Sequence, residues 1–156
     1  MRTFLLLAAA ASLLAAPASA MSARQVVEKE VAVRLPDGTE TVERVPADTV
    51  SPGERVVYSL IFTNDESEPV SDLVLTAPVP VETTLVEGSA DRPGIDLVVS
   101  VDGGASFGPR GAAVVREADG STRRASAADI THLRWTVPGP VAPGQTDSLV
   151  FKAVLD

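Results

Sequence analysis

The 156-residue chain contains no cysteine and only one histidine, His132. Without cysteine it forms neither disulfides nor thiolate metal sites, so packing alone must stabilise the fold. One histidine cannot supply a two-histidine metal site, and any serine–histidine–aspartate triad would have to include it. The G-x-S-x-G motif is also missing. We therefore predict no catalytic residue, no metal ligand and no cofactor, and give His132 a structural or solvent-facing role.

Long apolar runs are confined to the first twenty residues, MRTFLLLAAAASLLAAPASA. This stretch combines basic Arg2, an apolar run too short for a comfortable membrane span, and a small-x-small end at residues 18–20. It predicts a secretory signal peptide, residues 1–20, cut after Ala20. No cysteine follows that would carry a lipid anchor, and no later stretch reaches spanning length. We expect a protein secreted to the periplasm or the extracellular medium.

Positive charge is scarce after residue 20, where 12 basic side chains face 21 acidic ones, a net charge of −9. This balance favours solubility and argues against nucleic acid or anionic lipid as a partner. The remaining length suits a single domain, residues 21–156, that buries roughly two thirds of its unfolded surface.

Helical periodicity is missing as well, and strand periodicity takes its place. In the clearest strand, Val56, Tyr58, Leu60 and Phe62 share one face. Similar alternation recurs at 26–34, 39–45, 70–76, 95–101, 130–137 and 145–155, between proline- and glycine-rich turns. The pattern predicts an all-β protein, an immunoglobulin-like antiparallel β-sandwich of about seven to nine strands. A closed barrel is the alternative.

Two stretches are less regular. The prolines of residues 78–90 permit an edge strand or a crossing connection but not a central strand. Residues 108–129 are irregular, with a short hairpin expected around Asp119-Gly120.

Pro52-Gly53 and Pro143-Gly144 each precede a strand, and a type II turn places such a glycine at positive φ. The strands between these two Pro-Gly segments are dissimilar. We therefore interpret the two segments as the same type of turn, used twice to begin a strand, and not as an internal repeat.

Three segments together carry a family resemblance: VSPGERVVYSLIFTN at 50–64, PVPVETTLVEGSA at 78–90, and ITHLRW at 130–135 followed by VAPG. They resemble the bacterial "domain of unknown function eleven", a repeat module of exported and cell-surface proteins. The resemblance covers most of 45–156 and implies an immunoglobulin-like sandwich but no particular activity. This chain carries one copy and no evident anchor, which weakens the interpretation as a long surface stalk.

Residues 100–107, SVDGGASF, match the S-x-D-x-G-x-x-F pattern of the Asp-box, a hairpin turn known from sialidase-type propellers. In such a turn the Asp102 carboxylate bonds backbone N–H groups and the aromatic Phe107 tucks beneath it, which braces the loop. A propeller needs several copies, and this chain has one. We therefore predict a structural turn here.

Acidic loops raise the question of calcium, which takes six to eight oxygen ligands. One such loop contains Asn64, Asp65, Glu66 and Glu68. Its spacing is not that of an EF-hand, and a solvated loop is favoured.

A lysine–asparagine isopeptide bond is another possibility for an exported sandwich, but the only residues available for it are Lys29, Lys152 and Asn64. Lys29 on the first strand could lie beside the last strand, but Asn64 ends an interior strand, so this bond is disfavoured.

Aromatic side chains after residue 20 number five, and we expect all of them in the core rather than on a carbohydrate-binding surface: Tyr58, Phe62, Phe107, Trp135 and Phe151. Four arginines gather in the irregular segment: Arg110, Arg116, Arg123 and Arg124. This basic cluster suits an anionic partner, but a solvated loop is favoured.

These features predict an exported, non-enzymatic structural or interaction module of the bacterial cell envelope or extracellular space. Its partner is expected to be an envelope or extracellular protein, bound by an exposed sheet edge or by the loop 108–129. The alternative is a small carbohydrate- or calcium-binding β-sandwich module in the same compartment. A hydrolase built on His132 is a third hypothesis, and it requires a second titrating group beside that histidine.

Overall fold

The computed structural model describes residues 21–156, so the predicted signal peptide, residues 1–20, lies outside the described part. The elements are β1 (Met21–Arg34), β2 (Glu40–Pro46), β3 (Arg55–Asn64), β4 (Leu73–Pro78), β5 (Thr83–Leu85), β6 (Asp96–Ser100), η1 (Arg110–Ala112), β7 (Val114–Arg116), β8 (Thr122–Arg124), η2 (Ala127–Asp129), β9 (His132–Val137) and β10 (Thr146–Leu155). Within these residues no helix has both the length and the apolar character that a membrane crossing requires.

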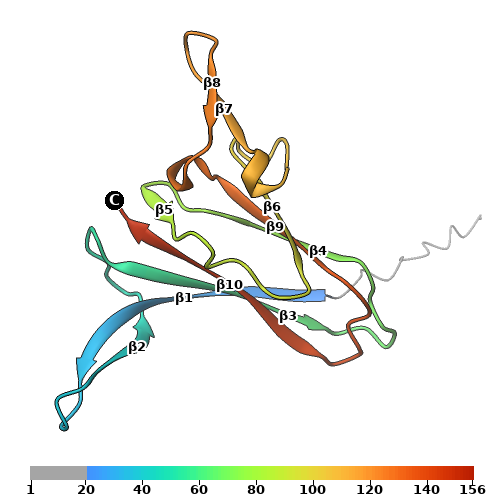
Figure 1. Ribbon diagram of the computed structural model, residues 1–156. Helices are drawn as coiled ribbons and strands as arrows, with labels where there is room; N and C mark the ends of the chain where they lie inside the picture. Colours follow the sequence, from blue (N-terminus) through green and yellow to red (C-terminus); the bar gives the residue numbers. More distant parts are fainter. Residues whose placement is uncertain (1–20) are drawn as a thin grey trace, which may run out of the picture.

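Eight strands form two antiparallel sheets, which confirms the all-β prediction. The larger sheet has the order β2-β1-β3-β10-β5 and the smaller β4-β9-β6 (Figure 1). Buried side chains from both sheets meet in one core, so the arrangement is a β-sandwich. No ladder joins the two sheets within 21–156, which rules out the closed barrel. Strands β7 and β8 form a separate hairpin outside the sandwich.

Aromatic rings join the two sheets at the centre of the core. The rings of Tyr58 on β3 and Phe151 on β10 stack with centroids 4.8 Å apart, and Trp135 on β9 lies 6.3 Å from Phe151. Trp135 and Phe151 are each 1% exposed. Such pairs contribute about 0.5–1.5 kcal/mol beyond the burial of their area. Four of the five aromatics, including Phe62, are therefore core residues, as predicted.

The outer face of the large sheet buries Val57 and Ser59 without a second layer. Val57 is fully buried although it points away from the core, on the same face as its cross-strand partner Lys152. The Lys152 ammonium pairs with Glu30 on β1, and Arg55 reaches the same carboxylate at 3.4 Å. Long side chains can cover apolar surface with their aliphatic stems, which accounts for the burial of Val57, and the side chains of Lys152 and Glu30 are themselves only 28% and 12% exposed.

The two Pro-Gly turns act on the same pair of strands. Gly53, at φ 85°, precedes β3, and Gly144, at φ 72°, precedes β10, its antiparallel neighbour. The N–H of Gly53 donates to the carbonyl oxygen of Leu155 at 2.7 Å, and the N–H of Gly144 donates to that of Asn64 at 2.7 Å. Each turn therefore closes one end of the β3–β10 ladder. The two Pro-Gly segments are therefore the same type of turn, each of which begins a strand, as predicted.

Two hairpins project from the sandwich at different ends (Figure 1). Strand β1 pairs with β3 over residues 21–29 and with β2 over residues 28–34, so the β1–β2 hairpin extends past the sheet. The second projection is β7–β8, which we call the arm (residues 114–124). Its turn contains Asp119-Gly120, which confirms the hairpin predicted inside the irregular segment.

Candidate functional site

Three stretches that carried separate sequence signals meet at one end of the sandwich. They are the Asp-box loop (residues 100–107), the crossing segment 78–82, and the segment 108–129 that carries the arm (Figure 1). Strand β9 begins between them at His132. A pocket and a groove lie on the two sides of the loop, so this end is the candidate functional site.

The Asp-box loop is braced around one carboxylate. Asp102 Oδ1 accepts hydrogen bonds from Ser100 Oγ at 2.6 Å and from the Ser106 N–H at 2.9 Å, and Oδ2 accepts the Ser106 hydroxyl. The N–H of Gly104 donates to Ser100 Oγ at 2.9 Å. The Ser100 hydroxyl, followed by the two donors of Ser106, holds the pKa of Asp102 well below its ordinary range. The predicted bracing role of this turn is confirmed.

The ring of Phe107, the last residue of this loop, does not lie where the sequence predicted. Its ring is half-buried and lies under the guanidinium of Arg134, whose Cζ is 3.5 Å from the ring centroid. Arg134 also donates from Nε to Thr76 Oγ1 at 3.2 Å. The expectation that Phe107 joins the core is wrong, because its ring packs against Arg134 on the outer face of β9, where a cation–π contact stabilises it.

His132 is partly exposed on the outer face of β9, opposite the buried Leu133, in agreement with the predicted solvent-facing position. Its Nδ1 lies 3.2 Å from Thr131 Oγ1. A Cβ added to Gly104 would lie 3.5 Å from the ring, so that glycine packs closely against the imidazole. Within 21–156 no other hydrogen bond to the imidazole exists, and the geometry gives no support to a triad.

Beside His132 lies a groove of about 530 Å³, lined largely by Pro78, Val79, Pro80, Val81 and Ile130. Val81 is 88% exposed. The next residue, Glu82, has φ 62°, a conformation that a non-glycine residue adopts at a cost of about 1–3 kcal/mol. The N–H of Asp156 donates to the carbonyl oxygen of Glu82 at 3.0 Å, and this hydrogen bond holds Glu82 in that conformation. The sequence predicted only a crossing here, since its prolines do not show which elements pack beside them.

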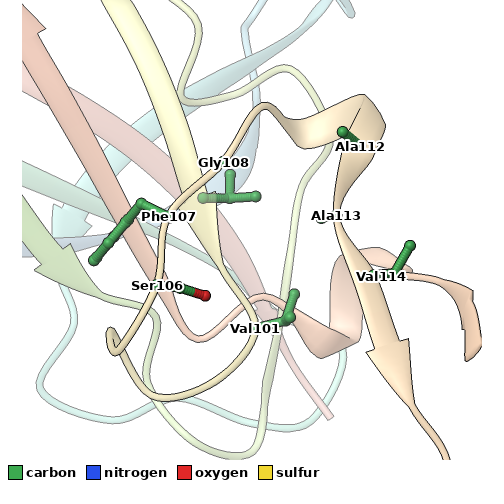
Figure 2. Close-up of a pocket in the computed structure, with 8 residues that line it drawn as sticks. Val101, Ser106, Phe107, Gly108, Ala112, Ala113 and Val114 are labelled. Atoms are coloured by element: carbon green, nitrogen blue, oxygen red, sulfur yellow. The ribbon is translucent and has the colours of Figure 1, made fainter.

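On the other side of the loop is a smaller pocket of about 200 Å³ (Figure 2). Figure 2 shows Val101, Ser106 and Gly108 on the loop side, and Ala112 and Val114 on the other. Most of its lining is aliphatic, and Val114, which opens the arm, is 55% exposed. The pocket therefore continues directly onto one face of the arm.

The predicted cluster of four arginines divides into two pairs with different roles. Arg110 donates to the Ala125 carbonyl at 2.9 Å and pairs with Glu87. Arg123 pairs with Asp129 and with Glu117, contacts that raise its pKa and lower the pKa of Asp129. These two arginines therefore hold the arm against the sandwich.

The side chains of the other two arginines, Arg116 and Arg124, have no hydrogen-bond or ion-pair partner in the described part of the chain. Their cross-strand neighbours are Thr122 and Val114, respectively. Side chains that alternate along paired strands share a face with their partners, so both guanidinium groups and Val114 lie on one face of the arm. That face carries no acidic side chain.

The acidic loop after β3 is organised by Asn64, which is fully buried. Its Nδ2 donates to the carbonyl oxygens of Glu68 at 2.9 Å and Val141 at 2.8 Å, and its Oδ1 accepts the N–H of Glu66 at 2.9 Å. Its amide therefore braces the loop. Across residues 21–156 no group of three or more histidine, aspartate or glutamate side chains could hold a metal ion.

Neither lysine meets Asn64. Lys29 pairs with Glu54 at 3.2 Å, and Lys152 pairs with Glu30. Lys29 does not lie beside the last strand, because β3 separates β1 from β10 in the large sheet. The geometry offers no route to the isopeptide bond that the sequence already disfavoured.

Comparison of the chain with protein-family models, with curated proteins and with solved structures finds no match. The resemblance to the domain of unknown function eleven thus stays a prediction carried by the three quoted segments. The geometry of the two hairpins and the loop end has to support any functional proposal.

Proposed function

We propose that this protein is an exported, non-enzymatic interaction module of the bacterial envelope or extracellular space. The arm and the pocket at its base form the surface that binds a protein partner. The observation that carries this proposal is the arm face of Val114, Arg116 and Arg124: two arginines without partners in the described residues, beside an apolar pocket, on an acidic protein. Unneutralised charge beside exposed apolar surface is typical of binding sites.

The base of the arm is rigid enough to present such a surface. Arg123 and Asp129 form two hydrogen bonds, at 2.7 and 2.8 Å, and Asp129 also accepts the N–H of Ser126 at 2.7 Å. On the other side of the pocket, the loop is braced by Asp102. A binding surface that is ordered before contact loses less conformational entropy on binding.

Export and the family resemblance support the same role. The signal-peptide pattern at residues 1–20 supports export from the cytoplasm, and the resemblance implies an immunoglobulin-like sandwich among exported and surface proteins. No specific observation favours the alternative, a carbohydrate- or calcium-binding module. Both oxygens of Asp102 are already bonded, and four of the five aromatic rings are buried.

The test captures partners from envelope and culture-fluid fractions with the purified protein and with the variant Arg116→Ala/Arg124→Ala. Arg24→Ala/Arg44→Ala is the matched control, since it removes two exposed arginines from β1 and β2. We expect a protein partner that the wild type and the control both retain and the arm variant loses. Equal retention by all three proteins would contradict the assignment of the arm, and N-terminal sequencing of the exported protein at Met21 tests the secretion.

A further inference from the structure

The turn that closes the β1–β2 hairpin contains the step Asp37-Gly38, followed by Thr39. The N–H of Gly38 donates to the carbonyl oxygen of Leu35 at 2.9 Å, and Gly38 has φ 87°. Asp37 Oδ1 accepts the Thr39 N–H at 2.9 Å and the Thr39 hydroxyl at 2.6 Å. The carboxylate of the aspartate and the amide of the glycine are therefore both engaged with other residues.

The arm is closed by a second turn with the same bonds, at Asp119-Gly120-Ser121. The N–H of Gly120 donates to the carbonyl oxygen of Glu117 at 3.0 Å, and Gly120 also has φ 87°. Asp119 Oδ1 accepts the Ser121 N–H at 2.9 Å and the Ser121 hydroxyl at 2.6 Å. The two turns close different hairpins (Figure 1), so the same arrangement occurs twice on this chain.

Aspartate followed by glycine is the aspartyl step most prone to rearrangement, because glycine has no side chain to obstruct ring closure. The lone pair of the glycine nitrogen attacks Cγ of the protonated carboxyl group, and the amide proton leaves with the carboxyl hydroxyl as water. The product is a five-membered succinimide. Water then adds to the former main-chain carbonyl and breaks its bond to the nitrogen, which stays bonded to Cγ. The resulting isoaspartate carries the main chain through its side chain.

We propose that Asp37 and Asp119 are sites of spontaneous isoaspartate formation, and that Thr39 and Ser121 keep this modification slow. In each turn the residue after the glycine holds the carboxylate through two hydrogen bonds. The glycine nitrogen, which is the attacking atom, presents its N–H to a carbonyl oxygen three positions earlier. Ring closure has to break both sets of bonds.

The same donors also reduce the reactive form of the carboxyl group. The hydroxyl of Thr39, followed by its N–H, lowers the pKa of Asp37. The hydroxyl of Ser121, followed by its N–H, lowers the pKa of Asp119. Because the protonated carboxyl is the form that loses water in ring closure, a lowered pKa leaves less of the reactive acid at neutral pH. The hydroxyl of each turn thus acts on protonation as well as on geometry.

The third Asp-Gly step of the described chain, Asp102-Gly103, is held as well. Asp102 accepts the hydroxyl of Ser100 at 2.6 Å and the N–H of Ser106 at 2.9 Å. By contrast, the carboxylates of Asp48 and Asp65, which precede larger residues, accept no hydrogen bond within the described residues. Hydroxyl donors therefore accompany every Asp-Gly step of residues 21–156.

Isoaspartate adds one carbon atom to the main chain within a turn, and the length of the turn fixes the register of a hairpin. In the arm, that register pairs Arg116 with Thr122 and Val114 with Arg124. Modification at Asp119 would therefore disturb the arm face. The chemistry needs no partner, so its test stands apart from that of the proposed function.

The experiment incubates the purified protein at pH 6 and 37 °C for several weeks and measures isoaspartate at each site by peptide mapping with electron-transfer fragmentation. Thr39→Val and Ser121→Ala each remove one hydroxyl and keep the backbone donor. We expect isoaspartate to form about fivefold faster or more at Asp37 in the first variant and at Asp119 in the second, because hydrogen bonds to a charged group are among the stronger ones. The unchanged turn in each variant serves as the reference.

Thr41→Val is the matched control for Thr39→Val, because the Thr41 hydroxyl makes no hydrogen bond within residues 21–156. It should leave both rates unchanged, and thermal melts verify that each variant is folded. Ser121→Ala combined with Asp119→Glu should abolish the product at the arm, because a glutamate side chain has to close a six-membered ring, which is much slower.

Equal rates in the wild type and in both hydroxyl variants would overturn the proposal. A rise at both turns in either variant would also overturn it, because it would indicate a general loosening of the fold and no specific role of the hydroxyl. An increase confined to the turn that lost its hydroxyl supports the assignment of that turn.

Discussion

The indole N–H of Trp135 donates a hydrogen bond of 3.0 Å to the carbonyl oxygen of Ala90. Trp135 belongs to β9 of the small sheet, whereas Ala90 lies in the connection between β5 and β6. The preceding residue, Ser89, accepts the N–H of Lys152 on β10 at 2.9 Å. The Trp135 side chain thus joins this connection to the small sheet, and Ser89 joins the same connection to the large sheet.

Replacement of Trp135 by alanine should therefore lower the free energy of unfolding by about 3–5 kcal/mol. The substitution leaves a cavity beside Phe151 and an unsatisfied carbonyl at Ala90. Trp135→Phe keeps most of the apolar volume but loses the hydrogen bond, so it should cost clearly less than Trp135→Ala. Urea denaturation of both variants measures the difference, and equal costs would contradict the packing role of the indole.

Replacement of Asp102 by asparagine should loosen the Asp-box loop in a pH-dependent way. The folded-state pKa of Asp102 is lowered, so its stabilising effect is fully present above the ordinary aspartate pKa of about 3.9. That effect is lost as the pH falls toward the lowered folded-state pKa. Wild type and Asp102→Asn should therefore differ in melting temperature at pH 7 and converge in strong acid.

The control for this prediction is Asp48→Asn. Asp48 is exposed, and its side chain makes no hydrogen bond in the described part of the chain. Its replacement should leave the melting temperature almost unchanged at every pH. A constant difference between wild type and Asp102→Asn down to pH 2 would show that the carboxylate charge does not brace the loop.

Gly53→Ala should destabilise the protein by about 1–2 kcal/mol, because the left-handed conformation at φ 85° is costly for a residue with a Cβ. No atom lies within 4 Å of the added Cβ, so the cost comes from the backbone alone. Gly111→Ala is the matched control, since Gly111 has the same open surroundings without the positive φ. Chemical denaturation should show a small effect there, and a similar loss at both sites would refute the turn assignment.

Glu54, the residue after Gly53, belongs to the same turn and has a role of its own that the sequence did not indicate. Its carboxylate accepts the N–H of Ser51 at 2.6 Å and pairs with Lys29 at 3.2 Å. Both contacts, with the Ser51 N–H first, lower the pKa of Glu54. Substitution here removes a turn cap as well as a charge.

Asn64→Asp should destabilise the protein at neutral pH by about 3 kcal/mol. The change replaces a buried amide donor by a carboxylate oxygen that faces the carbonyl oxygens of Glu68 and Val141. Because protonation restores a donor, the loss should shrink in acid. Asp65→Asn, at the exposed next position, is the control in the same thermal melts, and a pH-independent loss for Asn64→Asp would contradict this account.

Strand identities could be predicted where alternation was regular. The inward row of Val56, Tyr58 and Phe62 and the buried Leu133 and Trp135 follow directly from a period of two. The neighbours of each strand did not follow, because pairing depends on contacts distant in sequence. The surroundings of Lys29 are an example, since nothing local shows that β3 lies between β1 and β10.

At the candidate site, local chemistry was predictable and spatial grouping was not. The bracing role of Asp102 depends on residues within four positions, so the pattern of residues 100–107 was sufficient. The four arginines of 108–129 looked equivalent in sequence. Their division depends on Glu87, Glu117 and Asp129, and Glu87 comes from a distant connection.

The reciprocal closure of β3 and β10 by Gly53 and Gly144 has a consequence for local opening. Strand pairs usually fray from their ends, and amide protons there exchange with solvent through small openings. Here the amide of each turn glycine holds the far end of the partner strand. The ladder therefore has no loose end, and its terminal amides should exchange nearly as slowly as its central ones, only when the whole domain unfolds. In a chain without disulfides, this closure also leaves no opened strand end for a protease to bind.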